Sequence, residues 1–247
     1  MSIRLFDTPE AVANAAAADA VALMSDLLDK QPEVHVCLTG GTVGILTIAK
    51  LLDQPAIWDL DWSRVHLWWG DERFVAQDSK DRNAMQAYEA ALSQLPLRGR
   101  NVHEFPAFDA ENPLGIDSQL SSAVDLFELE LSPYLDTTGM PNFDLAFVGM
   151  GPDGHICSLF PGKPEIASGV AVIAEHDSPK PPPHRLSFSY EAMSNCKRIW
   201  FTVAGADKAP AVANTLRGQA EFPAARVKAQ IETIWYLDTA AASELAE

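Results

Sequence analysis

The sequence predicts an α/β protein in which a mainly parallel, Rossmann-like sheet is covered by helices on both faces. Two observations support this prediction. Short apolar runs, which are typical of buried strands, alternate along the chain with segments whose apolar residues recur at helical spacing. Three strands also end in glycine-rich or charged loops, and such loops converge at one edge of a parallel sheet. We expect residues 1–247 to form a single domain, because 247 residues suit one large α/β core.

The period of the apolar residues defines each predicted element. Helical spacing is clearest over 116–135, where Leu120, Val124 and Phe127 share one face. Strands are predicted where short, mostly apolar runs are bounded by turn residues. In chain order we predict a helix marked by Val12, Ala16, Ala20, Leu23 and Leu27, a strand at 34–38, a helix ending at Leu52, a strand at 65–69, helices at 81–92 and 116–135, strands at 144–148, 170–174, 185–189 and 199–204, a helix at 207–216 and a strand at 234–237.

The balance of charged residues narrows the possible partners. The chain has 34 Asp and Glu against 18 Lys and Arg, which gives a formal charge of −16. Nucleic acid and anionic membrane surfaces both require a basic face, so neither is expected as a partner. An anionic substrate would have to be held by a few local cations.

Cysteine usage and hydropathy indicate a cytoplasmic protein. The three cysteines, Cys37, Cys157 and Cys196, are far apart and lack the spacing of a zinc site or a disulfide framework, so no metal is expected. The N-terminal segment contains no apolar core of signal-peptide length. No apolar stretch is expected to reach the roughly 20 residues that a membrane helix needs.

Two loops after predicted strands carry candidate binding residues. Thr39-Gly40-Gly41-Thr42 precedes a helix, whose N-terminal N–H groups could bind phosphate, although a simple turn with Thr42 as N-cap explains the same residues. Gly70-Asp71-Glu72-Arg73 follows a buried strand. The alternative there is a solvated turn whose paired charges contribute under about 1 kcal/mol. The place of this segment at the carboxyl edge of the sheet favours a role for Asp71 or Glu72 in orienting a histidine or a sugar hydroxyl. It also favours a role for Arg73 in binding phosphate.

The segment 149–155, Gly-Met-Gly-Pro-Asp-Gly-His, follows another predicted buried strand. Glycines at such a place let the backbone approach a ligand closely, and imidazole is the side chain used most often for proton transfer. A structural histidine is the alternative, but this setting favours catalysis by His155. The segment also matches GxGxxG, which predicts dinucleotide binding only where a helix begins at the glycines; Pro161-Gly162 argues against such a helix. His66, within a strand pattern, is expected to be packed.

Two further cations begin predicted elements. Arg185 starts a strand after the proline-rich segment 178–183, which we interpret as a stiff loop, and Lys208 opens a helix after Gly205. Ordinary surface charge explains either residue on spacing alone. In an acidic chain, both are also candidates for binding an anion.

Together these motifs resemble the 6-phosphogluconolactonase family, within the larger group that includes glucosamine-6-phosphate deaminase/isomerase. The resemblance runs from about residue 5 to residue 240. Val43-Gly44 and Ile156-Cys157 depart from the family pattern without removing a polar group that the chemistry needs. The segments that carry the resemblance are 38–42, 69–75, 81–83, 149–162, 183–187 and 205–208.

The resemblance implies hydrolysis of 6-phospho-D-glucono-1,5-lactone to 6-phospho-D-gluconate, in the oxidative pentose phosphate pathway, without a metal or other cofactor. His155 would take a proton from the attacking water, Asp71 would orient His155 or a sugar hydroxyl, and loop N–H groups would stabilise the oxyanion. The residues expected to bind the sugar and its 6-phosphate are Gly40, Gly41, Thr42, Arg73, Asn83, Gly151, Asp153, Gly154, Arg185 and Lys208.

Two other functions stay open. An amino-sugar-6-phosphate deaminase/isomerase would need a second acid shortly after its histidine, whereas the five residues that follow His155 include none. A non-catalytic sugar-phosphate sensor would usually carry a DNA-binding module, and no helix-turn-helix segment is expected before residue 10.

Overall fold

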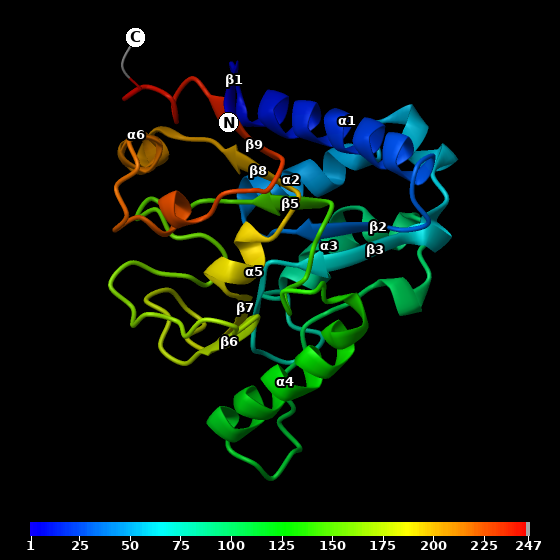
Figure 1. Cartoon of the computed structure of the whole chain (residues 1–247), viewed down its shortest axis with the longest axis vertical. Helices are drawn as coiled ribbons and strands as arrows, with labels where there is room; N and C mark the ends of the chain where they lie inside the picture. The colour runs from blue at the N-terminus through cyan, green and yellow to red at the C-terminus, as the bar shows by residue number, and fades with distance from the viewer. Residues whose placement is uncertain (246–247) are drawn as a thin grey trace.

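The computed structural model describes residues 1–245 of the chain, and its centre is a six-stranded parallel sheet (Figure 1). The strand order is β1-β9-β8-β5-β2-β3, and every neighbouring pair is parallel. The predicted α/β class with a mainly parallel sheet is therefore confirmed. The six strands are β1 (Ser2–Phe6), β2 (Val34–Leu38), β3 (Val65–Trp69), β5 (Leu145–Val148), β8 (Arg198–Val203) and β9 (Glu232–Asp238).

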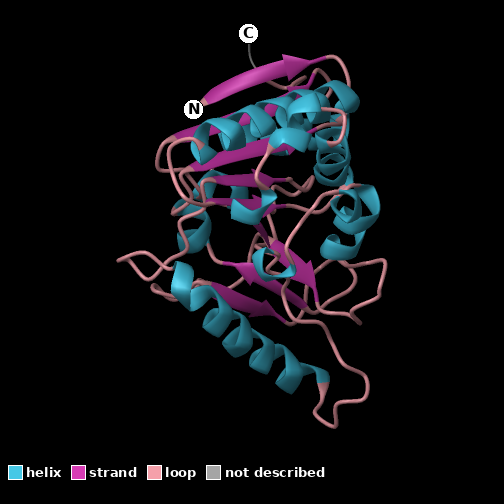
Figure 2. Cartoon of the chain, turned by 90° about the vertical axis from the view of Figure 1, so that its right-hand side faces the viewer, coloured by secondary structure: helices cyan, strands magenta, loops and turns pink. Residues whose placement is uncertain are grey.

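The helices cover the sheet and connect its strands (Figure 2). α1 begins where Thr8 accepts a hydrogen bond from the Ala11 N–H and Pro9 occupies the first turn, which is a common N-terminal arrangement. It packs on α2 and on strands β8 and β9. The helices are α1 (Pro9–Leu28), α2 (Thr42–Leu51), α3 (Asn83–Ala90), α4 (Ile116–Leu131), α5 (Tyr190–Ser194) and α6 (Ala209–Leu216).

A second, three-stranded antiparallel sheet lies beside the large one, toward α4 in Figure 1. Its order is β4 (Asp71–Arg73), β7 (Arg185–Phe188) and β6 (Val172–Glu175). The sequence placed Asp71–Arg73 in a loop, and that prediction was wrong. Only Gly70 separates β4 from β3, so the chain leaves the parallel sheet and pairs at once with β7, where Arg73 lies opposite Arg185.

Other boundaries differ for physical reasons. β1 was not predicted, because as an edge strand it is mostly exposed and lacks an apolar run. The helix predicted over 116–135 ends at Leu131, and Ser132–Tyr134 forms a 3-10 turn around Pro133, which has no N–H to continue the helix. The predicted strands at 34–38 and 65–69 match β2 and β3 residue for residue.

α1 also corrects an expectation about hydropathy. Contrary to that expectation, its 20 residues are long and apolar enough to cross a membrane by length and composition. Half of its apolar window is buried within the protein, against α2 and the large sheet. Small residues that recur at helical spacing, Ala13, Ala16 and Ala20, are fully buried there, which lets the helix approach the sheet closely.

An aromatic cluster joins α4 to both sheets. Phe127 of α4 is fully buried, and its ring centroid lies 4.0 Å from that of Phe105, 6.0 Å from that of Phe188 and 6.1 Å from that of Trp68. Trp68 belongs to β3 and Phe188 to β7. The cluster therefore fixes the small sheet, with Asp71 and Arg185 on it, against the large one.

We predict that Phe127→Ala lowers the free energy of unfolding by about 3–5 kcal/mol, because the cavity that the missing ring leaves between the two sheets cannot fully collapse. Leu129→Ala on the same helix is the matched control: Leu129 is 72% exposed, and its truncation should change stability by no more than about 0.5 kcal/mol. Chemical denaturation of both variants checks this, and equal losses would contradict the role given to the cluster.

Candidate active site

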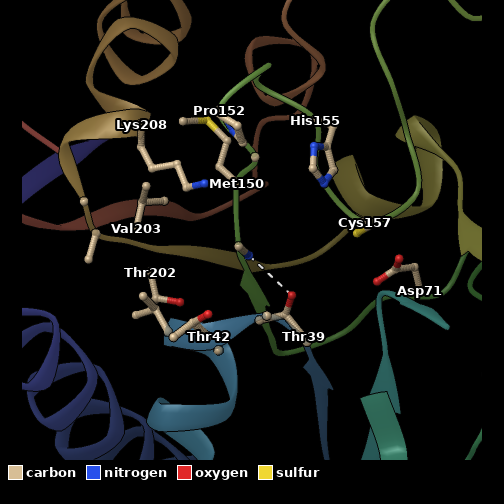
Figure 3. Close-up of a pocket in the computed structure, with 18 of the residues that line it drawn as sticks. Thr39, Thr42, Asp71, Met150, Pro152, His155, Cys157, Thr202, Val203 and Lys208 are labelled. Carbon is tan, nitrogen blue, oxygen red and sulfur yellow. Dashed lines mark hydrogen bonds between the residues drawn. The ribbon is translucent and has the colours of Figure 1, made fainter. Parts of the chain in front are cut away.

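A cavity of about 480 Å³ opens at the carboxyl edge of the large sheet (Figure 3). The loops that follow β2, β5 and β8 line it, together with β4, which follows β3, as expected for a parallel sheet. A hydrogen bond from the Gly149 N–H to Thr39 Oγ1, 3.3 Å long, ties the β5 loop to the β2 loop. Of the predicted site residues, those that line the cavity are Gly40, Gly41, Thr42, Asp71, Arg73, Asn83, Gly151, His155, Arg185 and Lys208; Asp153 and Gly154 do not.

His155 is held by a carboxylate two residues before it. Its Nδ1 lies 2.6 Å from Asp153 Oδ1, and its ring packs on Phe160 at 4.8 Å between centroids. An ionised carboxylate can only accept, so Nδ1 carries the proton and Nε2 keeps a lone pair. Although burial alone would raise its pKa, the hydrogen bond from His155 and the charges of His155 and Lys180 hold the pKa of Asp153 well below its usual range.

Lys180, which the sequence analysis did not assign, also reaches this pair. Its Nζ lies 3.1 Å from His155 Nδ1 and 3.4 Å from Asp153 Oδ1. Because Nδ1 already donates to Asp153, the contact between Lys180 and the ring is one of charge. The available signal was a lone cation within the proline-rich segment that precedes Arg185.

Asp71 and Glu72 are adjacent but have different surroundings. Glu72 is 1% exposed and turns away from the cavity, and its carboxylate accepts the N–H groups of Arg73, Asn83 and Ala84 at 2.6–2.9 Å. It thereby caps the N-terminus of α3, although burial raises its pKa. Asp71 lines the cavity instead.

Asp71 contacts other partners than the histidine. Its Oδ2 accepts the Ser158 hydroxyl at 2.6 Å, its Oδ1 lies 3.3 Å from Asn83 Nδ2, and Arg185 Nη1 is 3.9 Å away. The carboxylate that orients His155 is that of Asp153, not Asp71. Of the two roles expected for Asp71, orienting His155 does not fit these partners, whereas contact with a substrate hydroxyl does.

Two glycines of the His155 loop are required by close packing. A Cβ on Gly151 would lie 2.0 Å from His155 Nδ1, and a Cβ on Gly154, whose φ is +76°, would lie 2.4 Å from the Phe222 ring. Their N–H groups donate to the carbonyls of His155 and Gly151. Neither N–H is free for a ligand, so these glycines make room for side chains instead of cradling an anion.

The N-terminus of α2 is the clearest anion site on the cavity wall. Gly41, with φ +79°, is the N-cap and offers no side-chain hydrogen bond, so the first N–H groups of the helix lack a side-chain partner. The alternative interpretation, a turn with Thr42 as N-cap, does not hold, because Thr42 is already the first helical residue. Figure 3 shows Thr42 and Lys208 on one side of the cavity, with His155 and Asp71 on the other.

Arg185 is buried and holds a loop. Its Nε donates to the Pro182 carbonyl at 2.9 Å, and its Nη2 donates to the carbonyls of Lys180 and Pro181 at 3.0 and 3.2 Å. Burial lowers its pKa, partly offset by Asp71. Arg185 therefore fixes the segment that carries Lys180, which sequence spacing could not show.

Asn83 fits against the first glycine loop. Its Nδ2 donates to the Asp71 carbonyl at 2.8 Å, while a Cβ on Gly40 would lie 1.9 Å from its Oδ1. That Oδ1 is buried and accepts no hydrogen bond from the described residues. Among residues 1–245, the two groups of side chains that could hold a metal ion, Glu33-His35-His66 and Asp117-His176-His184, lie outside the cavity lining.

The fold and the cavity define an α/β protein with a small-molecule site at the carboxyl edge of its sheet. The sequence profile of the glucosamine-6-phosphate isomerases/6-phosphogluconolactonase family matches residues 7–235, and the chain belongs to this family. The recognition made from the motifs is thereby confirmed.

Relatives within the family share nearly the whole chain. It is 40% identical over 240 residues to the 6-phosphogluconolactonase of Streptomyces coelicolor, covering 96% of this chain and 91% of that protein. It is 34% identical over 247 residues to the 6-phosphogluconolactonase of Mycobacterium tuberculosis, covering 99% and 98%.

Solved structures agree on the fold. The crystal structure of 6-phosphogluconolactonase from Thermotoga maritima superimposes with a TM-score of 0.80 at 25% identity, covering 96% of this chain and 100% of that one. A monomeric glucosamine-6-phosphate deaminase reaches a TM-score of 0.76 at 19% identity, covering 99% and 100%. Because both activities occur on this fold, the choice between them depends on the site.

Proposed function

We propose that this protein hydrolyses 6-phospho-D-glucono-1,5-lactone to 6-phospho-D-gluconate, a step of the pentose phosphate pathway. The observation that carries the proposal is that His155 lies on the cavity wall with its Nδ1 2.6 Å from Asp153 Oδ1, a carboxylate outside the lining. The relatives described above support the choice of substrate. A lactone is an activated ester, so one positioned base and a water molecule suffice.

In the proposed reaction His155 Nε2 takes a proton from the water that attacks C1, and Asp153 stabilises the imidazolium that forms. The tetrahedral intermediate then collapses, and the imidazolium returns its proton to the departing ring oxygen. General-base help of this kind contributes about 10²–10⁴-fold. The N–H groups of Gly149, Gly151 and Gly154 are occupied, so negative charge on the attacked oxygen falls to the cations Lys180 and Arg73.

The other end of the substrate is a phosphate. Because the N-terminus of α2 and Lys208 lie across the cavity from His155, we assign the 6-phosphate to them (Figure 3). Asp71 and Asn83, which line the cavity, are assigned to sugar hydroxyls. Arg185, predicted from the sequence as a phosphate ligand, supports the wall mainly through the loop carbonyls it binds.

The reaction product distinguishes a lactonase from a deaminase. Purified protein should form 6-phosphogluconate from the freshly prepared lactone faster than spontaneous opening, and should release no ammonia from glucosamine 6-phosphate. Ammonia release without lactonase activity would reverse the assignment, and binding of 6-phosphogluconate without any rate enhancement would indicate the sensor.

We predict that His155→Ala lowers kcat by at least about 100-fold, because the water loses its base. Binding of 6-phosphogluconate, measured by calorimetry, should persist, since the phosphate site lies across the cavity. An unchanged kcat would remove His155 from the mechanism.

We predict that Asp153→Asn lowers kcat by about 100-fold or more, because the His155 ring loses the carboxylate that accepts its Nδ1 proton and orients it. That carboxylate is ionised in the parent protein, since the pKa of Asp153 is held well below its usual range. Steady-state kinetics check this, and an unchanged kcat would contradict the assigned contact.

Lys208→Ala should raise KM for the phosphorylated lactone by about 10–100-fold, the equivalent of one charge-assisted hydrogen bond. KM for unphosphorylated glucono-1,5-lactone should change little. Steady-state kinetics on both substrates, with the exposed Lys30→Ala as control, distinguishes these outcomes. An equal effect on both substrates would refute the phosphate assignment.

A further inference from the structure

A cluster of one carboxylate and two imidazoles lies outside the cavity lining. Asp117 Oδ1 is 2.8 Å from His176 Nδ1 and 3.4 Å from His184 Nε2. The three ligand atoms all lie within 4.8 Å of one another.

These atoms have the identity and spacing of a metal site. A tetrahedral zinc ion with bonds of about 2.0 Å places its ligand atoms about 3.3 Å apart. We propose that Asp117, His176 and His184 bind a divalent transition-metal ion of the zinc class, with water in the remaining position. Asp117 and His176 are exposed, and the proposal requires their side chains to rotate until the set closes around the ion.

The second ring nitrogens are free to carry the protons that such binding requires. Each metal-bound imidazole must keep its proton on the other nitrogen. His176 Nε2 and His184 Nδ1 make no hydrogen bond or ion pair with the residues that the structure describes. Neither tautomer is therefore blocked by the protein.

The other candidate cluster fails this test. Glu33, His35 and His66 also bring three ligand atoms together. However, Trp68 Nε1, which can only donate, lies 3.2 Å from His35 Nδ1 and places the His35 proton on Nε2, the atom that would have to bind the metal. This cluster supplies the matched control.

The proposed metal site joins the two ends of the loop between β6 and β7. His176 follows β6 directly and His184 precedes β7, so the two imidazoles stand at the two ends of the segment 176–184, while Asp117 lies in the first turn of α4. Midway along the segment, Lys180 contacts His155. A bound ion would tie both ends of the segment to α4 and limit the motion of Lys180; only the effect on catalysis rests on the proposed function.

Metal binding can be measured on the full-length protein freed of metal by a chelator. Titration with Co²⁺ should give the visible absorption of a tetrahedral ion, and calorimetry with Zn²⁺ should find one such site per chain. His176→Gln and His184→Gln should each weaken binding by at least about 100-fold, the upper end of the effect of removing a supporting group. His66→Gln and His155→Gln should bind as the parent does.

Hydrogen exchange tests the tether independently of activity. Zn²⁺ should slow amide exchange over 177–183 in the parent protein and leave it unchanged in the His176→Gln, His184→Gln double variant. Equal Zn²⁺ affinity in parent and double variant, or loss of binding in His66→Gln or His155→Gln, would overturn the site. Binding without slower exchange would overturn the tether.

Discussion

The parallel register of β2 with its two neighbours is the constraint on which the rest of the site depends. Leu38 pairs with Trp69 of β3, and Cys37 pairs with Ala146 of β5, so three strands run to the same edge together. The segments that follow these three strands therefore lie close together at that edge. The Thr39–Gly149 hydrogen bond then fixes two of those loops to each other. The geometry of the cavity is thus a result of strand pairing more than of loop sequence.

Much of this arrangement could be predicted, because the strong signals are local. The apolar runs at 34–38 and 65–69, and the glycine loop that follows the first of them, can be recognised in the sequence. Contacts between residues that are far apart in the sequence cannot be predicted in the same way. Lys180 reaches His155 only because β7 pairs with β4, and β4 has three residues, too few for a period to show. The distinction between Asp71 and Glu72 also needs three dimensions, since neighbouring strand residues face opposite sides.

The glycines illustrate how a correct signal can have an unexpected cause. Glycine-rich loops indicate that something approaches the backbone closely. At Gly40 and Gly151 that something is a side chain of the protein itself, Asn83 in one case and His155 in the other. The free N–H groups are found instead at the start of α2. Gly151 thus provides steric room for the His155 side chain, whereas the donors for an anion lie at the start of α2.

The three carbonyls bound by Arg185 have a consequence for redesign. A guanidinium offers several donors in a fixed plane, whereas an ammonium group is a single point of charge, so a lysine at this position could not reproduce the same bonds. Arg185 therefore both orders the loop 180–182 and places a positive charge beside it. Attempts to widen the accepted range of sugars would do better to vary the surroundings of Asn83 and leave this position intact.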